Sequence, residues 1–191
     1  MGKERLEAFS DGVIAIIITI MVLELRTPQG VDLDALRPLL PVLLSYVLSF
    51  IYIGIYWNNH HHMLRAASKV NGRILWANLH LLFWLSLVPF TTRWMGENGF
   101  APLPVALYGV VLLMAGVAYY ILARALAAHH GKDSLLARAL GNDFKGLASI
   151  AIYAAAIALS FREPRLACTL YVAVALMWIV PDRRIEDRLA S

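Results

Sequence analysis

Long hydrophobic runs, separated by short clusters of charged and polar residues, set the pattern of this chain. The charged clusters divide it into six apolar segments, at residues 6–25, 38–58, 73–93, 97–124, 144–161 and 166–180. An α-helix needs about 20 apolar residues to cross the roughly 30 Å hydrocarbon core of a bilayer. The last two segments are somewhat short, so we expect their flanking arginines to reach toward the interface. The pattern predicts an all-α, polytopic membrane protein with six transmembrane helices in a single domain, residues 1–191.

The composition supports a membrane protein and excludes several other classes. Hydrophobic residues make up 60% of the 191 residues and charged residues only 16%, whereas soluble domains carry about 25% charged residues. The basic residues lie between the apolar runs, so the formal charge of +4 does not indicate a nucleic-acid-binding face. Cys168 is the single cysteine, which excludes an intramolecular disulfide and a cysteine-based zinc site within one chain. We expect no cleavage of the first segment, because no small-x-small pattern follows it.

Lysine and arginine are distributed unequally between the two sides of the predicted membrane. If the N-terminus is inside, the outside loops hold Arg26, Arg37, Arg93, Arg162 and Arg165, and the other 12 of the 17 basic residues are inside. Basic residues favour the cytoplasmic side. We therefore expect both termini in the cytoplasm, which is consistent with an even number of spans.

Ser10 and Asp11 are polar groups near the start of the first apolar segment. Asp11 lies six residues past Arg5, roughly 9 Å deeper at ~1.5 Å per residue, and a carboxylate at that depth is costly without a partner. His80 lies about as deep in the third segment, which enters from the same side. We predict a polar cluster of Ser10, Asp11 and His80, joined by Trp76 or Asn78, between the first and third helices. Alternatively, Asp11 simply satisfies one histidine of the bundle.

The helical wheel separates the polar pair from an apolar stripe on the first helix. At ~100° per residue, the stripe consists of Gly12, Ile16, Ile20 and Leu23, with Thr19 on its flank. Ser10 and Asp11 lie about 120° and 140° from Ile16, on the two sides of the opposite face. We therefore expect the polar pair to support the helix from behind. Taken alone, the stripe is typical of ordinary helix packing.

The string Arg5-x-x-x-Phe9-Ser10-Asp11, at the start of the first of six spans, resembles the signature of the transmembrane-protein-175 family. That family comprises endosomal and lysosomal potassium channels and their bacterial relatives. The resemblance covers the whole chain, because six spans with both termini inside is the family's repeat unit. Animal members carry two repeats and this chain carries one, so the resemblance implies a prokaryotic member in the cell membrane that acts as a homotetramer in the lipid bilayer.

The resemblance implies a potassium-permeable cation channel without a carbonyl selectivity filter, and the sequence has no Thr-Val-Gly-Tyr-Gly loop. In the family, four copies of the first helix line the pore and bulky apolar side chains constrict it. The tightest position matches Ile16, the following layers match Ile20 and Leu23, and the threonine associated with cation preference matches Thr19. The signature residues are held by histidine, tryptophan and asparagine side chains, a role that fits His80, Trp76 and Asn78. No cofactor is implied beyond permeant potassium, with sodium and other monovalent cations as further candidates.

Two other function classes stay open. A proton-coupled transporter would use Asp11 and His80 as a proton relay, but it would also be expected to show an inverted repeat or spans broken at mid-membrane. The prolines instead cluster at span ends, Pro89 excepted. A membrane-embedded enzyme would need a convergent catalytic set, and one aspartate with one histidine does not supply it. We therefore expect no enzymatic activity.

The run His60-His61-His62 lies at the inner end of the second segment. Adjacent helical residues point in different directions, so the three side chains cannot converge on one metal without bending the helix. We expect no metal site here. Interfacial anchoring or a proton-sensitive contact with the gate is favoured, because histidine changes charge near physiological pH.

Overall fold

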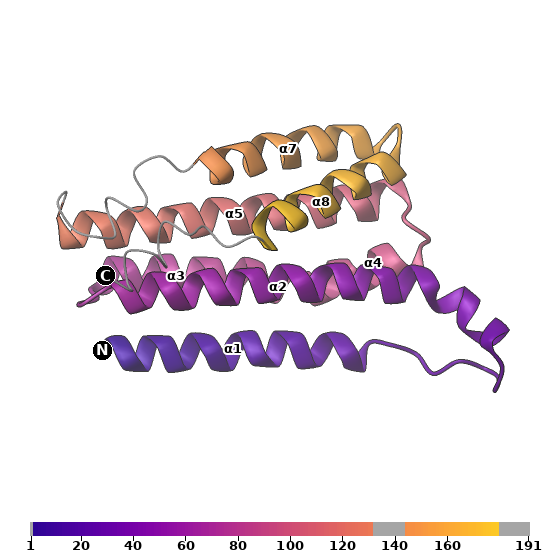
Figure 1. Ribbon diagram of the computed structural model, residues 1–191, viewed down its shortest axis with the longest axis horizontal. Helices are drawn as coiled ribbons and strands as arrows, with labels where there is room; N and C mark the ends of the chain where they lie inside the picture. The colour runs from indigo at the N-terminus through magenta and orange to yellow at the C-terminus, as the bar shows by residue number, and fades with distance from the viewer. Residues whose placement is uncertain (1, 132–143, 180–191) are drawn as a thin grey trace.

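The computed structural model describes residues 2–131 and 144–179, and its regular elements are all helices. They are α1 (Lys3–Leu23), the 3-10 helix η1 (Leu33–Leu39), α2 (Leu40–Ala66), α3 (Gly72–Ser86), α4 (Val88–Glu97), α5 (Pro102–His130), α7 (Phe144–Ser160) and α8 (Pro164–Ile179). The long helices lie side by side in a bundle (Figure 1). The prediction of an all-α fold is confirmed.

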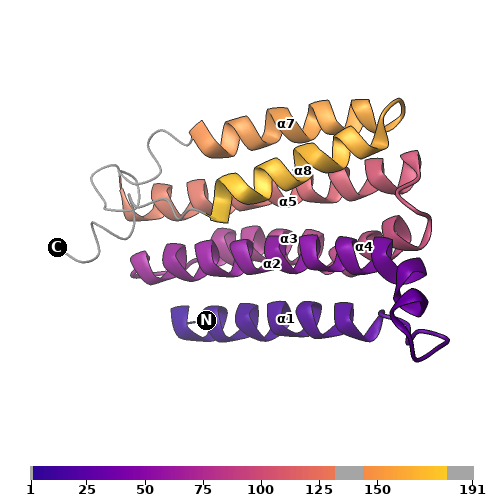
Figure 2. The same cartoon turned by 45° about the vertical axis from the view of Figure 1, so that its right-hand side comes forward.

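Four stretches of the described chain are long and apolar enough to cross a membrane: Lys3–Leu23, Leu33–Ala66, Gly72–Glu97 and Pro102–His130. The helices α7 and α8 are shorter apolar helices that run alongside them (Figures 1 and 2). These six units match the six predicted segments in order. Val180, at the end of the sixth predicted segment, and the basic residues at positions 132, 138, 183, 184 and 188 lie outside the described residues.

Three helix boundaries differ from the prediction, and one of them is the end of α5, which continues to His130, beyond the predicted end at Arg124. The third segment is divided at Leu87 into α3 and α4. Pro89 has no amide hydrogen to donate and is tolerated only in the first turn of a helix, so a new helix begins just before it. The second segment continues as α2 to Ala66, beyond the predicted end at Asn58. The three consecutive histidines are therefore helical and face different directions.

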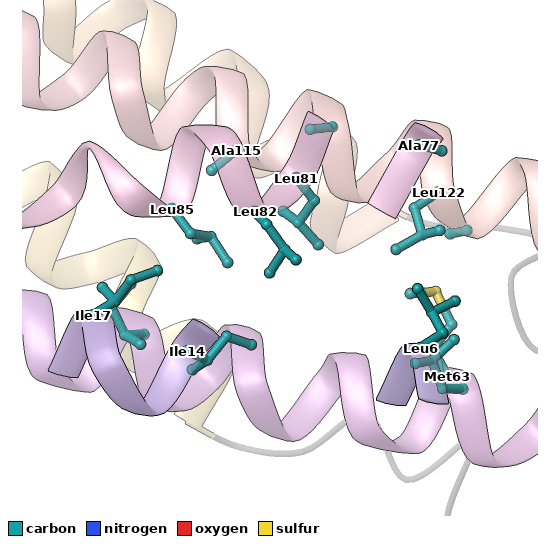
Figure 3. Close-up of a cluster of buried hydrophobic side chains, with 14 of the residues drawn as sticks. Leu6, Ile14, Ile17, Met63, Ala77, Leu81, Leu82, Leu85, Ala115 and Leu122 are labelled. Atoms are coloured by element: carbon teal, nitrogen blue, oxygen red, sulfur yellow. The ribbon is translucent and has the colours of Figure 1, made fainter. Parts of the chain in front are cut away.

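Two apolar clusters hold the bundle together. The first joins α1, α2, α3 and α5, and Figure 3 shows Leu6 beside Met63, and Ile14 and Ile17 facing Leu82 and Leu85. The second joins α2, α4, α5, α7 and α8 and contains the buried tyrosines Tyr52, Tyr108, Tyr153 and Tyr171. The helix α1 thus lies at one edge of the bundle and α7 at the opposite edge (Figures 1 and 2).

Two glycines permit close contact between helices. A Cβ at Gly96 of α4 would lie 2.7 Å from the Cα of Val42 in α2, and a Cβ at Gly109 of α5 would overlap the Tyr171 hydroxyl of α8. Small residues at helix contacts are typical of membrane bundles, where close packing replaces the hydrophobic effect as a driving force.

Candidate functional site

The helix α1 has one buried and one open face. Its buried residues are Leu6, Ser10, Ile14, Ile17 and Met21. On the other face, the exposed fraction is 58% for Ile16, 42% for Ile20 and 81% for Leu23. No described helix lies on this outer side of α1 (Figures 1 and 2). Ser10 therefore lies on the buried face and the apolar stripe on the open face, and Asp11 lies between them with intermediate exposure.

The other residues of the apolar stripe and of the Arg-x-x-x-Phe-Ser-Asp string are also exposed on the surface of the chain, apart from the polar pair. Arg5, Phe9, Gly12 and Thr19 are all exposed. The Thr19 hydroxyl donates a hydrogen bond to the carbonyl of Ile16, 3.0 Å away on its own helix. Its oxygen lone pairs therefore stay available on the open face of α1.

A buried hydrogen-bond network joins α1, α2 and α3. The Asn78 Nδ2 group donates to Ser10 Oγ at 2.9 Å, and Ser10 Oγ donates to the Leu6 carbonyl at 2.8 Å. On its other side, Asn78 Oδ1 lies 2.7 Å from His60 Nε2 and accepts a hydrogen bond from it, because the Nδ2 group of the same amide donates to Ser10. Ser10, Asn78 and His60 are each at most 1% exposed. Within the described chain, His60 Nδ1 has no hydrogen-bond partner.

A second network lies at the contact of α1 with α2, nearer the surface. Trp57 Nε1 donates to Asp11 Oδ1 at 3.0 Å, and His61 Nδ1 lies 3.2 Å from Glu7 Oε1. The Trp57 and His61 rings are stacked, with centroids 6.1 Å apart. Glu7 and Asp11 are spaced i,i+4 on α1, and the two ring-bearing residues are spaced i,i+4 on α2. Each pair therefore lies on one face of its helix. Two carboxylates on α1 therefore meet two nitrogen-bearing rings on α2.

The structure gives Asp11 a different partner from the one predicted. His80 Nε2 instead accepts a hydrogen bond from Trp84 Nε1, 3.0 Å away on the same helix, and Trp76 is 75% exposed. The prediction considered how deep His80 lies along its helix but not the direction in which its side chain points. Two residues turn a helix by ~200°, so His80 points away from α1 when Asn78 points toward it.

Three residues of the network, Trp57, His60 and His61, were not among the predicted site residues. All three lie on the last turns of α2, which the depth argument did not consider. The sequence did contain a signal for two of them: Glu7 and Asp11 are spaced i,i+4 on the first helix, and Trp57 and His61 have the same spacing on the second.

The C-terminal end of α1 is held by a chain of ion pairs. Arg93 of α4 pairs with Glu24, the residue that follows α1, and its Nε donates to Glu97 Oε1 at 3.2 Å. Arg26, in the loop after α1, lies 2.8 Å from the same Glu97 oxygen. The helix is therefore tied to its neighbours at both ends.

An open groove of about 510 Å³ runs between α1 and the α3–α4 pair. Its wall contains Ile16 and Ile20 from α1 and Pro89 and Phe90 from α4, with Glu24 and Arg93 also lining it. The groove is mostly apolar. Among the described residues, no group of three or more histidine, cysteine, aspartate or glutamate side chains is placed to hold a metal ion.

Comparisons with known proteins all point to one group of channels. Residues 5–89 match the family model described as the endosomal/lysosomal potassium channel TMEM175. A protein named as a potassium channel from a Chryseobacterium species is 55% identical over 189 residues, which covers 99% of this chain and 98% of that protein. The human protein named as the endosomal/lysosomal proton channel TMEM175 is 25% identical over 120 residues, 60% of this chain and 24% of that protein.

A solved structure has the same fold. It is the crystal structure of a lysosomal potassium-selective channel TMEM175 homolog from Chamaesiphon minutus, with a TM-score of 0.81 and 26% sequence identity. The match covers 93% of this chain and 96% of that one. The similarity in fold therefore extends beyond the N-terminal half that the family model matches.

Proposed function

Because the chain belongs to the family of the endosomal/lysosomal potassium channel TMEM175, we propose that it forms a potassium-permeable cation channel. The family consists of ion channels and not of enzymes. The observation that carries the proposal is the open face of α1, an apolar stripe left uncovered at the edge of the bundle. In the proposed homotetramer, four such faces surround a central pore.

The proposed gate is hydrophobic. Ile16, Ile20 and Leu23 would form successive rings spread over roughly 10 Å of pore, at ~1.5 Å per residue. Narrow rings of isoleucine and leucine exclude water and close a pore, and they pass partly hydrated ions when the helices rotate or move apart. Because α1 is a regular helix throughout, its carbonyls stay within its own hydrogen bonds and do not line a filter. Thr19 supplies the only hydroxyl on the stripe, so we expect modest discrimination between potassium and sodium.

The two hydrogen-bond networks would hold α1 in register behind this gate. Ser10 contacts Asn78 on one side of the helix and Asp11 contacts Trp57 on the other. Together they fix the rotation of α1 about its axis. Since rotation decides which side chains face the pore, these contacts would set the width of the constriction.

We place the N-terminal end of α1 in the cytoplasm of a prokaryotic cell. Lys3, Arg5, Arg65, Lys69 and Arg73 belong to the N-terminal end of α1 and the junction of α2 with α3, which lie at the same end of the bundle (Figure 1). Such an accumulation favours the cytoplasmic side of a cell membrane.

The alternative of a proton-coupled transporter needs a path between Asp11 and His80. Each of these side chains is hydrogen-bonded to a tryptophan instead, Asp11 to Trp57 and His80 to Trp84. The geometry therefore favours the channel.

The proposal is tested by reconstituting the purified protein into potassium-loaded liposomes and measuring the potassium flux. Wild-type protein should release potassium down its gradient, and Ile16→Ala should raise the flux because the constriction is wider. Ile121→Ala is the matched control, since Ile121 on α5 is also exposed, at 43% against 58% for Ile16, but lies away from the stripe. Equal flux from Ile16→Ala and wild-type protein would contradict the pore assignment.

A further inference from the structure

His61 makes an unusual contact at the inner end of the proposed pore helix. Its Nδ1 lies 3.2 Å from Glu7 Oε1, and the two side chains are 34% and 22% exposed. Its ring stacks on Trp57, whose Nε1 holds Asp11 one turn further along α1. A single histidine of α2 thus contacts one carboxylate of α1 directly and a second one through a tryptophan.

The strength of this contact depends on the charge of the imidazole. Neutral histidine with a proton on Nδ1 donates an ordinary hydrogen bond to a carboxylate. Protonated histidine makes the same contact as a charge-assisted hydrogen bond, which is roughly twice as strong. Histidine changes between these forms near physiological pH.

Charged and titratable groups of both helices surround His61. Glu7 faces it directly from α1, and Asp11 accepts a hydrogen bond from the edge of the Trp57 ring. On α2, the His62 ring is 5.7 Å away, and Arg65 is one turn further along, where its carbonyl accepts a hydrogen bond from Lys3 Nζ of α1 at 3.2 Å.

His60, the preceding residue, points the other way into the buried network with Asn78. Glu4 and Arg5 on α1 are exposed to solvent. The nearest carboxylate therefore belongs to the proposed pore helix itself, so a proton on His61 acts on that helix.

We propose that His61 and Glu7 form a pH-sensitive latch on α1: protonation of His61 ties the inner end of α1 to α2 and lowers cation flux. The latch rests on the proposed function, in which α1 must move to open the pore. The neutral pair holds α1 by a hydrogen bond, and the protonated pair holds it by an ion pair. A homotetramer carries one such latch on each α1 helix, so small effects in each subunit multiply.

The test is potassium flux from liposomes at several values of pH, set equal on both sides so that protein orientation does not matter. Wild-type flux should fall at least about fourfold between about pH 8 and about pH 6, because even the weakest exposed ion pairs, multiplied over four subunits, give about that factor. His61→Gln should remove this fall, because glutamine keeps a neutral donor for Glu7 and cannot become charged. Glu7→Gln should remove it by deleting the other partner.

His62→Gln is the matched control and should keep the wild-type pH profile, since it changes the neighbouring ring and leaves the Glu7 contact intact. Each variant is compared with wild type by size-exclusion chromatography, so that loss of assembly is recognised. Flux that is present but insensitive to pH, or a His61→Gln profile equal to wild type, would overturn the latch alone. Absence of flux at every pH would contradict the channel function and the latch with it.

Discussion

Asn78 is the residue whose replacement most directly tests how α1 is held. Its side chain links Ser10 of α1 to His60 of α2 while itself belonging to α3. All three side chains are buried, so no water replaces the lost partner without a rearrangement. Asn78→Ala removes the donor to Ser10 and the acceptor for His60 in one step.

The expected loss of unfolding free energy follows from the number of hydrogen bonds that Asn78→Ala removes. Hydrogen bonds between membrane helices contribute on average about 0.6 kcal/mol and at most about 1.7 kcal/mol each. Leaving a buried polar group without a partner costs about 1–3 kcal/mol more. His60 would be left in that position, because its Nδ1 already has no partner in the described chain. We expect Asn78→Ala to lower the free energy of unfolding by about 2–4 kcal/mol.

Unfolding of the purified protein in detergent micelles, by heat or by denaturing detergent, measures this loss. Leu79→Ala is the matched control, because Leu79 is the next residue, is 41% exposed, and should change stability by only about 0.5 kcal/mol. Combining Ser10→Ala with Asn78→Ala gives the coupling between the two side chains. The reasoning is refuted if Asn78→Ala is as stable as the control, or if the two substitutions simply add.

Two further substitutions test the packing and the second network. Gly109→Ala should lower the unfolding free energy by about 1–3 kcal/mol, because the added methyl group overlaps the Tyr171 hydroxyl. Thermal unfolding measures this, and Gly12→Ala, where a Cβ meets nothing within 4 Å, should show no such loss. Trp57→Phe keeps an aromatic side chain but removes the donor to Asp11, and should lower the free energy of unfolding by about 0.6–1.7 kcal/mol. An unchanged melting profile for Trp57→Phe would show that Asp11 does not depend on it.

The fold could be predicted from the sequence because the spacing of charged clusters is a strong signal in a membrane protein. All six apolar segments are helical in the described chain. The division of the third segment at Leu87 was not predicted, although Pro89 marks the place, because a proline can either bend a membrane helix or begin a new one.

The site could be predicted only in part. The wheel correctly separated Ser10 from Ile16, because both lie on one helix whose geometry is known in advance. Contacts between helices need the rotation of each helix as well as the depth of each residue. Depth alone made His80 a plausible partner for Asp11, and only the structure showed that Trp57 donates to Asp11 and Asn78 to Ser10.

The pairing of Asp11 with Trp57 also has a consequence for how the chain enters the membrane during synthesis. The two residues are 46 positions apart, so α1 leaves the ribosome before its tryptophan partner does. Until then the carboxylate faces lipid or the insertion machinery without its hydrogen bond, which is unfavourable. Insertion of α1 and α2 together, as a helical hairpin, avoids this state. The signature aspartate thus makes the first helix of the chain dependent on the second for stable insertion.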